Sequence, residues 1–289
     1  MSDVARLLKL ATYSSVATAL VLILAKLGAW LTTGSVSVMA SLIDSLMDAG
    51  ASLINLFAVH YALMPADDEH RFGHGKAESL AGLGQATFIA GSALFLILQA
   101  VDRLRYPRPL EDMGVGILVM AFAVVATLVL LAIQRYVIRR TDSTAIRADS
   151  LHYASDLLTN LSIILALVLA QAGWEGLDPI FAIGIALYIS YSAWGIGREA
   201  VHQLMDRELG AAVQDRVRAL VTDHPQVRGV HGLRTRQSGR SEVIQLHVEL
   251  DGDLPLSEAH AVTDELEGRL LEAFPNADII IHQEPCPPS

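Results

Sequence analysis

Two pairs of metal-ligating side chains stand four residues apart inside apolar stretches of this 289-residue chain. The first pair is Asp44 and Asp48. The second pair is His152 and Asp156. Because residues at i and i+4 share one face of a helix, each helix presents both of its ligands to one point. Three carboxylates and one imidazole form a four-ligand set that suits a tetrahedral divalent ion such as zinc.

Aspartates are costly in a membrane, about 2.5–3.5 kcal/mol each at the centre of a spanning helix. We therefore expect these carboxylates to face the bundle interior, where a cation or protons neutralise them. The alternative is a structural brace, in which the aspartates pair with Lys26 or bond Asn55 and Asn160. One lysine cannot balance three carboxylates, which favours the cation. His152 lies near the start of its apolar stretch, so its helix must begin earlier, near Ser143, for the ligands to meet.

Six apolar windows of about membrane-spanning length precede residue 200 and predict an all-α six-helix membrane bundle. The expected helices occupy about residues 10–31, 36–63, 80–101, 113–134, 144–172 and 178–200 of a domain covering 1–207. If the N-terminus is inside, the inner segments contain ten Lys and Arg residues and the outer loops three. This bias predicts a multi-pass protein with both termini in the cytoplasm.

The remaining residues, 208–289, predict a soluble cytoplasmic α+β domain. The net charge of the whole chain is −10, and residues 201–289 carry 15 acidic and 8 basic side chains. This acidity argues against nucleic acid as a partner, because nothing neutralises the phosphates. The predicted order is helix, strand, strand, helix, strand, at 208–223, 230–236, 242–250, after an N-cap at Ser257, and at 278–282.

Two further groups of histidines and acids could bind metal. One lies between the second and third windows and contains Asp67, His70 and His74. The other is dispersed through the tail and contains His231, His247, His260, His282 and Glu284. Spacing alone leaves two interpretations open for each group, a metal site or solvated surface residues.

The combination of these motifs resembles the cation diffusion facilitator family. The Asp-x-x-x-Asp and His-x-x-x-Asp pairs contribute to the resemblance, and the segment Asp-Asp-Glu-His-Arg-Phe-Gly-His-Gly-Lys-Ala-Glu at 67–78 is especially similar to the bacterial YiiP and FieF branch. The resemblance implies a proton-coupled antiporter that exports zinc, with cadmium or iron(II) as other substrates, across the inner membrane. It also implies a homodimer in membrane lipid, with a metallochaperone-like αββαβ tail.

The same resemblance assigns roles to individual residues. It makes Asp44, Asp48, His152 and Asp156 the transport site, Asp67, His70 and His74 a loop site, and the five tail ligands a binuclear, regulatory zinc site. Glu284 replaces the aspartate usual in that branch, which adds a methylene while keeping the charge. Lys76 and Asp206 match a pair that links the membrane and tail regions near the dimer interface.

Two other classes of function compete with transport. A membrane-bound metal sensor would bind the ion without moving it. An intramembrane aspartyl protease would use two aspartates, but no Gly-x-Gly-Asp surrounds these. The chain also lacks a Gly-x-x-x-x-Gly-Lys-Ser/Thr motif, so no nucleotide partner is expected, and an ion gradient must supply the energy. We therefore predict a transporter rather than an enzyme.

Overall fold

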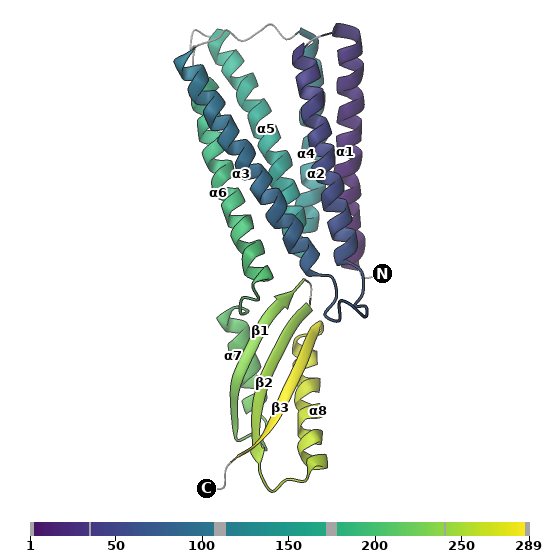
Figure 1. Cartoon of the computed structure of the whole chain (residues 1–289), viewed down its shortest axis with the longest axis vertical. Coiled ribbons are helices and arrows are strands. Elements are labelled where there is room, and N and C mark those ends of the chain that lie inside the picture. The colour runs from purple at the N-terminus through teal and green to yellow at the C-terminus, as the bar shows by residue number, and fades with distance from the viewer. Residues whose placement is uncertain (1–2, 35, 107–113, 172–177, 240, 287–289) are drawn as a thin grey trace. The chain divides into compact units, whose positions relative to one another are not determined.

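A computed structural model describes residues 3–34, 36–106, 114–171, 178–239 and 241–286 (Figure 1). The chain divides into two compact units. The first unit comprises Met1–Pro65 and Ala77–Val201. The second comprises Ala66–Lys76 and His202–Ser289, so the loop between the second and third helices belongs with the tail.

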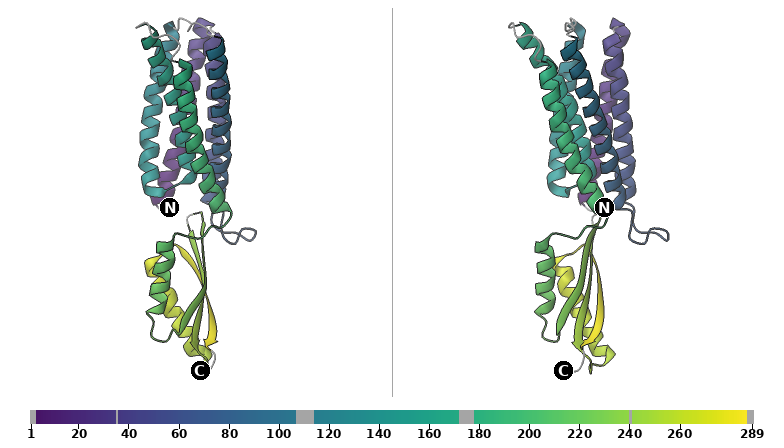
Figure 2. Two further views of the ribbon diagram at one scale, coloured as in Figure 1. Left: turned by 90° about the vertical axis from the view of Figure 1, so that its left-hand side faces the viewer. Right: turned by 60° about the vertical axis from the view of Figure 1, so that its left-hand side comes forward.

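The first unit is a bundle of long helices that run side by side (Figures 1 and 2). They are α1 (Asp3–Thr33), α2 (Val36–Ala62), α3 (Lys76–Arg105), α4 (Gly114–Thr141), α5 (Thr144–Gln171) and α6 (Asp178–Leu204). Helix α5 begins at Thr144, within one residue of the start expected for His152 to reach its partners. Residues 113 and 172, which the expected spans include, lie outside the described residues.

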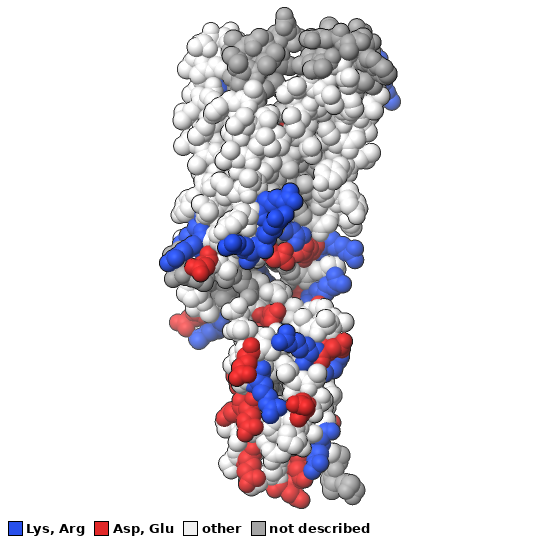
Figure 3. All heavy atoms as spheres, turned by 180° about the vertical axis from the view of Figure 1, so that it is seen from behind, with Lys and Arg blue, Asp and Glu red and all other residues white. Residues whose placement is uncertain are grey.

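Five of these helices, α1 to α4 and α6, contain described stretches long and apolar enough to cross a membrane. Helix α5 carries ionisable side chains in its first half, at Arg147, Asp149, His152 and Asp156. On the face drawn in Figure 3, acidic and basic side chains are nearly absent from the middle of the bundle and gather toward one end. This distribution is the one expected of a multi-pass membrane protein.

Small side chains allow the helices to approach closely, which is typical of helix contacts in lipid. In one core cluster, Ala11 and Ala145 accompany Leu8, Val59 and Val137 between α1, α2, α4 and α5. Between α3 and α6, the core is formed by Ile89, Ala93, Ala186, Ile189 and Ala193. Large apolar side chains on the outer surfaces of the bundle are exposed, which suits lipid rather than water as the surrounding solvent.

The tail of the second unit is a three-stranded sheet with two helices. In order, it contains α7 (Ala211–Thr222), β1 (Gly229–Ser238), β2 (Ser241–Asp251), α8 (Leu256–Ala273) and β3 (Ala277–Cys286). Strand β2 is central, antiparallel to β1 and parallel to β3. The predicted αββαβ order is therefore confirmed.

One face of this sheet is covered by α7 and α8 (Figure 2). Alternate residues of β2, including Leu246 and Val248, are buried against Val217 of α7 and Leu266 of α8. The intervening residues of β2 consequently face away from the helices. The predicted N-cap at Ser257 is wrong: α8 begins at Leu256 after Pro255, whose fixed φ suits a helix start without a side-chain cap.

Candidate metal sites

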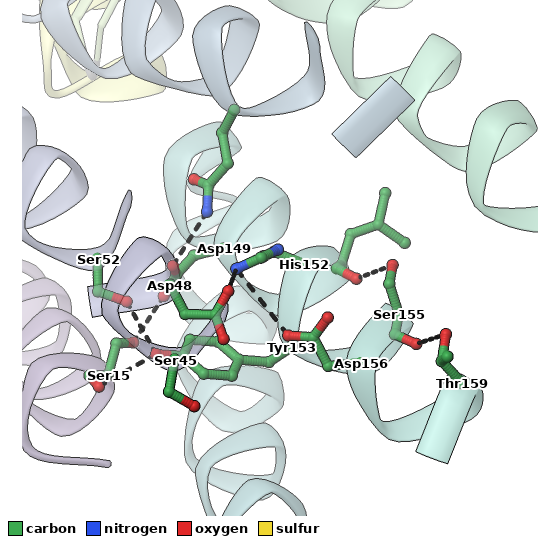
Figure 4. A network of polar contacts seen from close by, with 12 residues as sticks. Ser15, Ser45, Asp48, Ser52, Asp149, His152, Tyr153, Ser155, Asp156 and Thr159 are labelled. Carbon is green, nitrogen blue, oxygen red and sulfur yellow. Dashed lines mark hydrogen bonds and ion pairs between the residues drawn. The ribbon is translucent and has the colours of Figure 1, made fainter. Parts of the chain in front are cut away.

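The intramembrane site brings together three of the four predicted ligands (Figure 4). His152 Nε2 lies 3.1 Å from Asp48 Oδ1 and 4.0 Å from Asp156 Oδ2. One ligand atom from each residue can be chosen so that all three lie within 4.8 Å of one another. Among the residues that the structure describes, none forms a well-aligned hydrogen bond with the buried His152 Nε2, although Asp48 Oδ1 lies close to it. A cation among these three groups would satisfy that nitrogen.

Asp44, the fourth predicted ligand, lies outside this cluster. It is one turn before Asp48 on α2 and is exposed in the single chain. The structural brace, which is the alternative to a metal site, is also not formed by its expected partners. Lys26 Nζ donates to Ser41 O at 3.1 Å and to Ser45 Oγ at 2.6 Å, and both polar atoms of the buried Asn55 side chain lack a hydrogen-bond partner among the described residues.

The loop residues Asp67, His70 and His74 form a second three-residue cluster. Asp67 Oδ1 accepts hydrogen bonds from the backbone N–H groups of His70, at 2.6 Å, and Glu69, at 3.0 Å. His74 Nε2 lies 3.3 Å from Asp67 Oδ2. The backbone donors, that of His70 first, lower the pKa of Asp67. The turn therefore keeps a carboxylate ionised between two imidazoles, which is a suitable set for a divalent metal.

The tail cluster depends on strand register. His231 of β1 is opposite His247 of β2, and His247 is opposite His282 of β3, so three histidines form one row across the sheet. Glu284 joins them from β3, with Oε1 2.6 Å from His247 Nδ1 and Oε2 2.9 Å from His231 Nε2. The hydrogen bond from His247, followed by that from His231, lowers the pKa of Glu284.

Of the five predicted tail ligands, His231, His247 and Glu284 have ligand atoms close enough to share one ion. His282 flanks them, with Nε2 3.8 Å from Glu284 Oε1. His260 does not join the cluster, because it lies on α8, which covers the opposite face of the sheet, and pairs with Asp264 at 3.7 Å.

Lys76 and Asp206, the predicted linking pair, form an ion pair with 2.8 Å between Nζ and Oδ1. Arg236 Nη1 approaches the other Asp206 oxygen at 3.2 Å and stacks over the ring of Phe72, 5.0 Å from its centroid. The hydrogen bond from Lys76 is the main cause that lowers the pKa of Asp206. These contacts fasten the loop that bears His74 to the first strand of the tail.

Two acidic residues close to the predicted ligands were not predicted as part of the sites. Glu249 Oε1 lies 3.5 Å from His231 Nε2, and its position two residues after His247 on a strand indicated a shared face. Asp149 is fully buried on α5. Its spacing of three residues before His152 and seven before Asp156 is the helical spacing that indicated a third inward-facing acid.

Comparison with known families settles what kind of protein carries these sites. Residues 12–205 match the cation efflux transmembrane domain, and residues 209–286 match the cytoplasmic domain of cation efflux proteins. The chain belongs to the cation efflux, or cation diffusion facilitator, family. It is therefore a transporter of the multi-pass membrane type rather than an enzyme.

Relatives of this cation efflux protein resemble it along almost its whole length. The cation-efflux pump FieF of Escherichia fergusonii is 52% identical over 281 residues, which cover 97% of this chain and 94% of that pump. FieF of Shigella flexneri is 51% identical with the same coverage. A solved metal-bound C-terminal domain of the CzcD transporter from Thermotoga maritima is 26% identical, covering 27% of this chain and 94% of that chain with a TM-score of 0.25.

Proposed function

We propose that this chain exports zinc from the cytoplasm in exchange for protons, through the site formed by Asp48, His152 and Asp156. The observation that carries the proposal is the position of the buried His152 Nε2, which lies 3.1 Å from Asp48 Oδ1 and 4.0 Å from Asp156 Oδ2 and has no well-aligned hydrogen bond among the described residues. Burying such groups inside a membrane bundle is costly unless a cation or protons compensate them. Asp44, one turn away on α2, remains our predicted fourth ligand.

Competition between metal and protons supplies the coupling. Imidazole binds a metal only when it is neutral, and carboxylates bind it most strongly when they are ionised, so metal binding releases protons. Protons that enter from outside would displace the ion from His152 and the aspartates. Loss of those protons toward the cytoplasm would restore the empty, metal-binding state. One set of side chains can thus exchange a divalent cation for protons without a nucleotide.

The donor set favours zinc over harder ions. One imidazole and two or three carboxylates suit zinc, cadmium and iron(II), whereas magnesium and manganese prefer oxygen ligands alone. Relatives named cation-efflux pumps support export as the direction of transport. The excess of Lys and Arg in the inner segments over the outer loops supports an inner-membrane protein with both termini in the cytoplasm.

The loop and tail clusters are proposed as regulatory zinc sites. Each combines two imidazoles with one carboxylate: His70, His74 and Asp67 in the loop, and His231, His247 and Glu284 in the tail. Bound zinc there would report the cytoplasmic concentration to a homodimer, whose formation is supported by the match to the family's cytoplasmic domain. His260 and His282 remain predicted contributors to the tail site.

Transport is tested in proteoliposomes that report internal zinc and internal pH with separate dyes. We expect an imposed zinc gradient to drive zinc and protons in opposite directions. Asp48→Ala should abolish both fluxes. Asp3→Ala, which removes an exposed carboxylate at the start of α1, is the matched control and should transport normally. Full zinc flux through the Asp48→Ala protein would refute the assigned site.

The same assay separates the competing sensor function. A sensor would bind zinc, as measured by equilibrium dialysis, yet the internal zinc dye would not respond in any gradient. Zinc flux without a change in internal pH would instead support the zinc-export part of the proposal and refute the proton-coupling part.

A further inference from the structure

A second buried polar cluster lies about one helical turn from the metal ligands (Figure 4). It is centred on Asp149 of α5, whose side chain is fully buried. Asp149 Oδ2 accepts hydrogen bonds from Ser15 Oγ of α1, at 2.6 Å, and from Gln134 Nε2 of α4, at 2.8 Å. Asp149 Oδ1 accepts another from Gln85 Nε2 of α3, at 3.1 Å. One carboxylate thereby fastens α5 to three neighbouring helices.

This cluster is connected to the helix that carries Asp48. The backbone carbonyl of Ser15 accepts a hydrogen bond from Tyr153 Oη at 3.3 Å, and Tyr153 Oη also shares a 2.8 Å hydrogen bond with Ser52 Oγ of α2. Tyr153 follows His152 in α5, and Ser52 is one turn from Asp48 in α2. A chain of polar contacts therefore joins α5, α1 and α2 beside the two ligands that face each other.

Directional hydrogen bonds beside the metal site can fix the relative positions of the helices that carry its ligands. The metal ligands come from two different helices, and coordination tolerates displacements of only about 0.2 Å. Apolar packing between helices in lipid does not fix their axial register to that precision, because hydrocarbon tails solvate the same surfaces equally well. The hydrogen bonds that Asp149 accepts and those of the Tyr153 hydroxyl, in contrast, specify both the rotation of α5 and its height beside α2.

We propose that Asp149 is a positioning residue for the intramembrane metal site, acting through Ser15 and Tyr153 on the separation of Asp48 and His152. The inference rests on the proposed transport function and goes beyond it, because Asp149 is not one of the three ligands. A residue that only stabilises the fold would change the amount of folded protein but not the zinc concentration at which each folded molecule works. A positioning role for Asp149 therefore predicts a changed KM for zinc in its variants, whereas a purely structural role predicts an unchanged KM.

Asp149→Ala and Asp149→Asn are compared by zinc transport in proteoliposomes, normalised to folded protein. Asparagine has the same size and, with the Gln85 amide turned, can keep all three hydrogen bonds, whereas alanine loses them. Loss of an outer-shell partner typically costs 10–100-fold in metal affinity. We expect Asp149→Ala to raise KM about tenfold and Asp149→Asn to stay within about threefold of the unmodified protein.

Tyr153→Phe provides an independent test if the alanine variant does not fold, because it removes only the hydroxyl contacts to Ser15 and Ser52. It should raise KM in the same direction. Thr127→Val, buried on α4 but outside the cluster, is the control and should leave KM unchanged. An unchanged KM in Asp149→Ala or Tyr153→Phe would overturn the proposal. An Asp149→Asn protein as defective as the alanine variant would also overturn it, because the charge rather than the position would then matter.

The outcome remains separable from that of the proposed function. If the unmodified protein moves no zinc, the transport proposal fails, and the positioning role is then decided by zinc affinity in equilibrium dialysis. For that measurement, Asp67→Ala and His247→Ala remove the loop and tail clusters from every protein compared. Equal zinc affinities of the Asp149→Ala protein and the protein that retains Asp149 would reject the inference by itself.

Discussion

Replacing Gly232 with alanine should weaken zinc binding at the tail cluster while leaving its ligands chemically intact. Gly232 interrupts β1 at the irregularity between His231 and Arg234, and its φ is +60°. A Cβ atom at this position would lie 2.9 Å from Cδ2 of the His247 ring. The substitution therefore strains the backbone and pushes against a ligand at the same time.

The two effects have different sizes and different readouts. A left-handed conformation costs an ordinary L-residue about 1–2 kcal/mol, which lowers the stability of the tail. The ring must also retreat by about 0.5 Å to reach the ordinary contact distance of 3.4 Å. Metal sites tolerate about 0.2 Å, so we expect zinc affinity at the tail cluster to fall about tenfold, equivalent to about 1.4 kcal/mol.

The measurement uses the full chain carrying Asp48→Ala and Asp67→Ala, so that the tail cluster dominates zinc binding in equilibrium dialysis. Gly268→Ala is the matched control, because nothing lies within 4 Å of a Cβ atom added at that position of α8. Gly232→Asn separates strain from contact: asparagine tolerates positive φ but brings the same Cβ atom. It should recover stability without recovering affinity. A Gly232→Ala protein that binds zinc as tightly as the Gly268→Ala control would refute this reasoning.

Two further predictions concern the contacts that hold the clusters in place. Asp206→Asn should lower the stability of the tail unit at pH 7 by about 0.2–1 kcal/mol, since both partners are partly exposed. Lys76 lowers the pKa of Asp206 below its ordinary value of 3.8. The difference in stability between the two proteins should therefore persist above pH 4 and disappear as the pH falls through the lowered pKa. A difference in calorimetric stability that is unchanged at pH 2 would contradict the ion pair between Lys76 and Asp206. Gly82→Ala should destabilise the bundle by about 1–3 kcal/mol, because its Cβ atom would lie 2.9 Å from Thr144 Cγ2. Adding Thr144→Ser removes that methyl group and should restore the melting temperature in detergent, and failure of the rescue would argue against this contact.

The sequence alone determined the features that depend on local periodicity. A spacing of four residues places Asp48 beside Asp44, and His152 beside Asp156, on one helical face, whatever the rest of the chain does. Long apolar windows predicted the membrane helices, and the alternation around His247 predicted a strand with one buried face. The early start of α5 also followed, because His152 could not otherwise reach the depth of α2.

Tertiary structure decided which of these faces meet. Strand register brings His231, His247 and His282 into one row, and no local pattern contains the pairing of strands that are distant in sequence. The placement of α8 on the opposite face separates His260 from that row. Helix rotation and axial height within the bundle, which hydropathy does not encode, place Asp48 against His152 and leave Asp44 outside their cluster. The same long-range packing turns Asp149 from one more acid on α5 into the centre of a network that joins four helices.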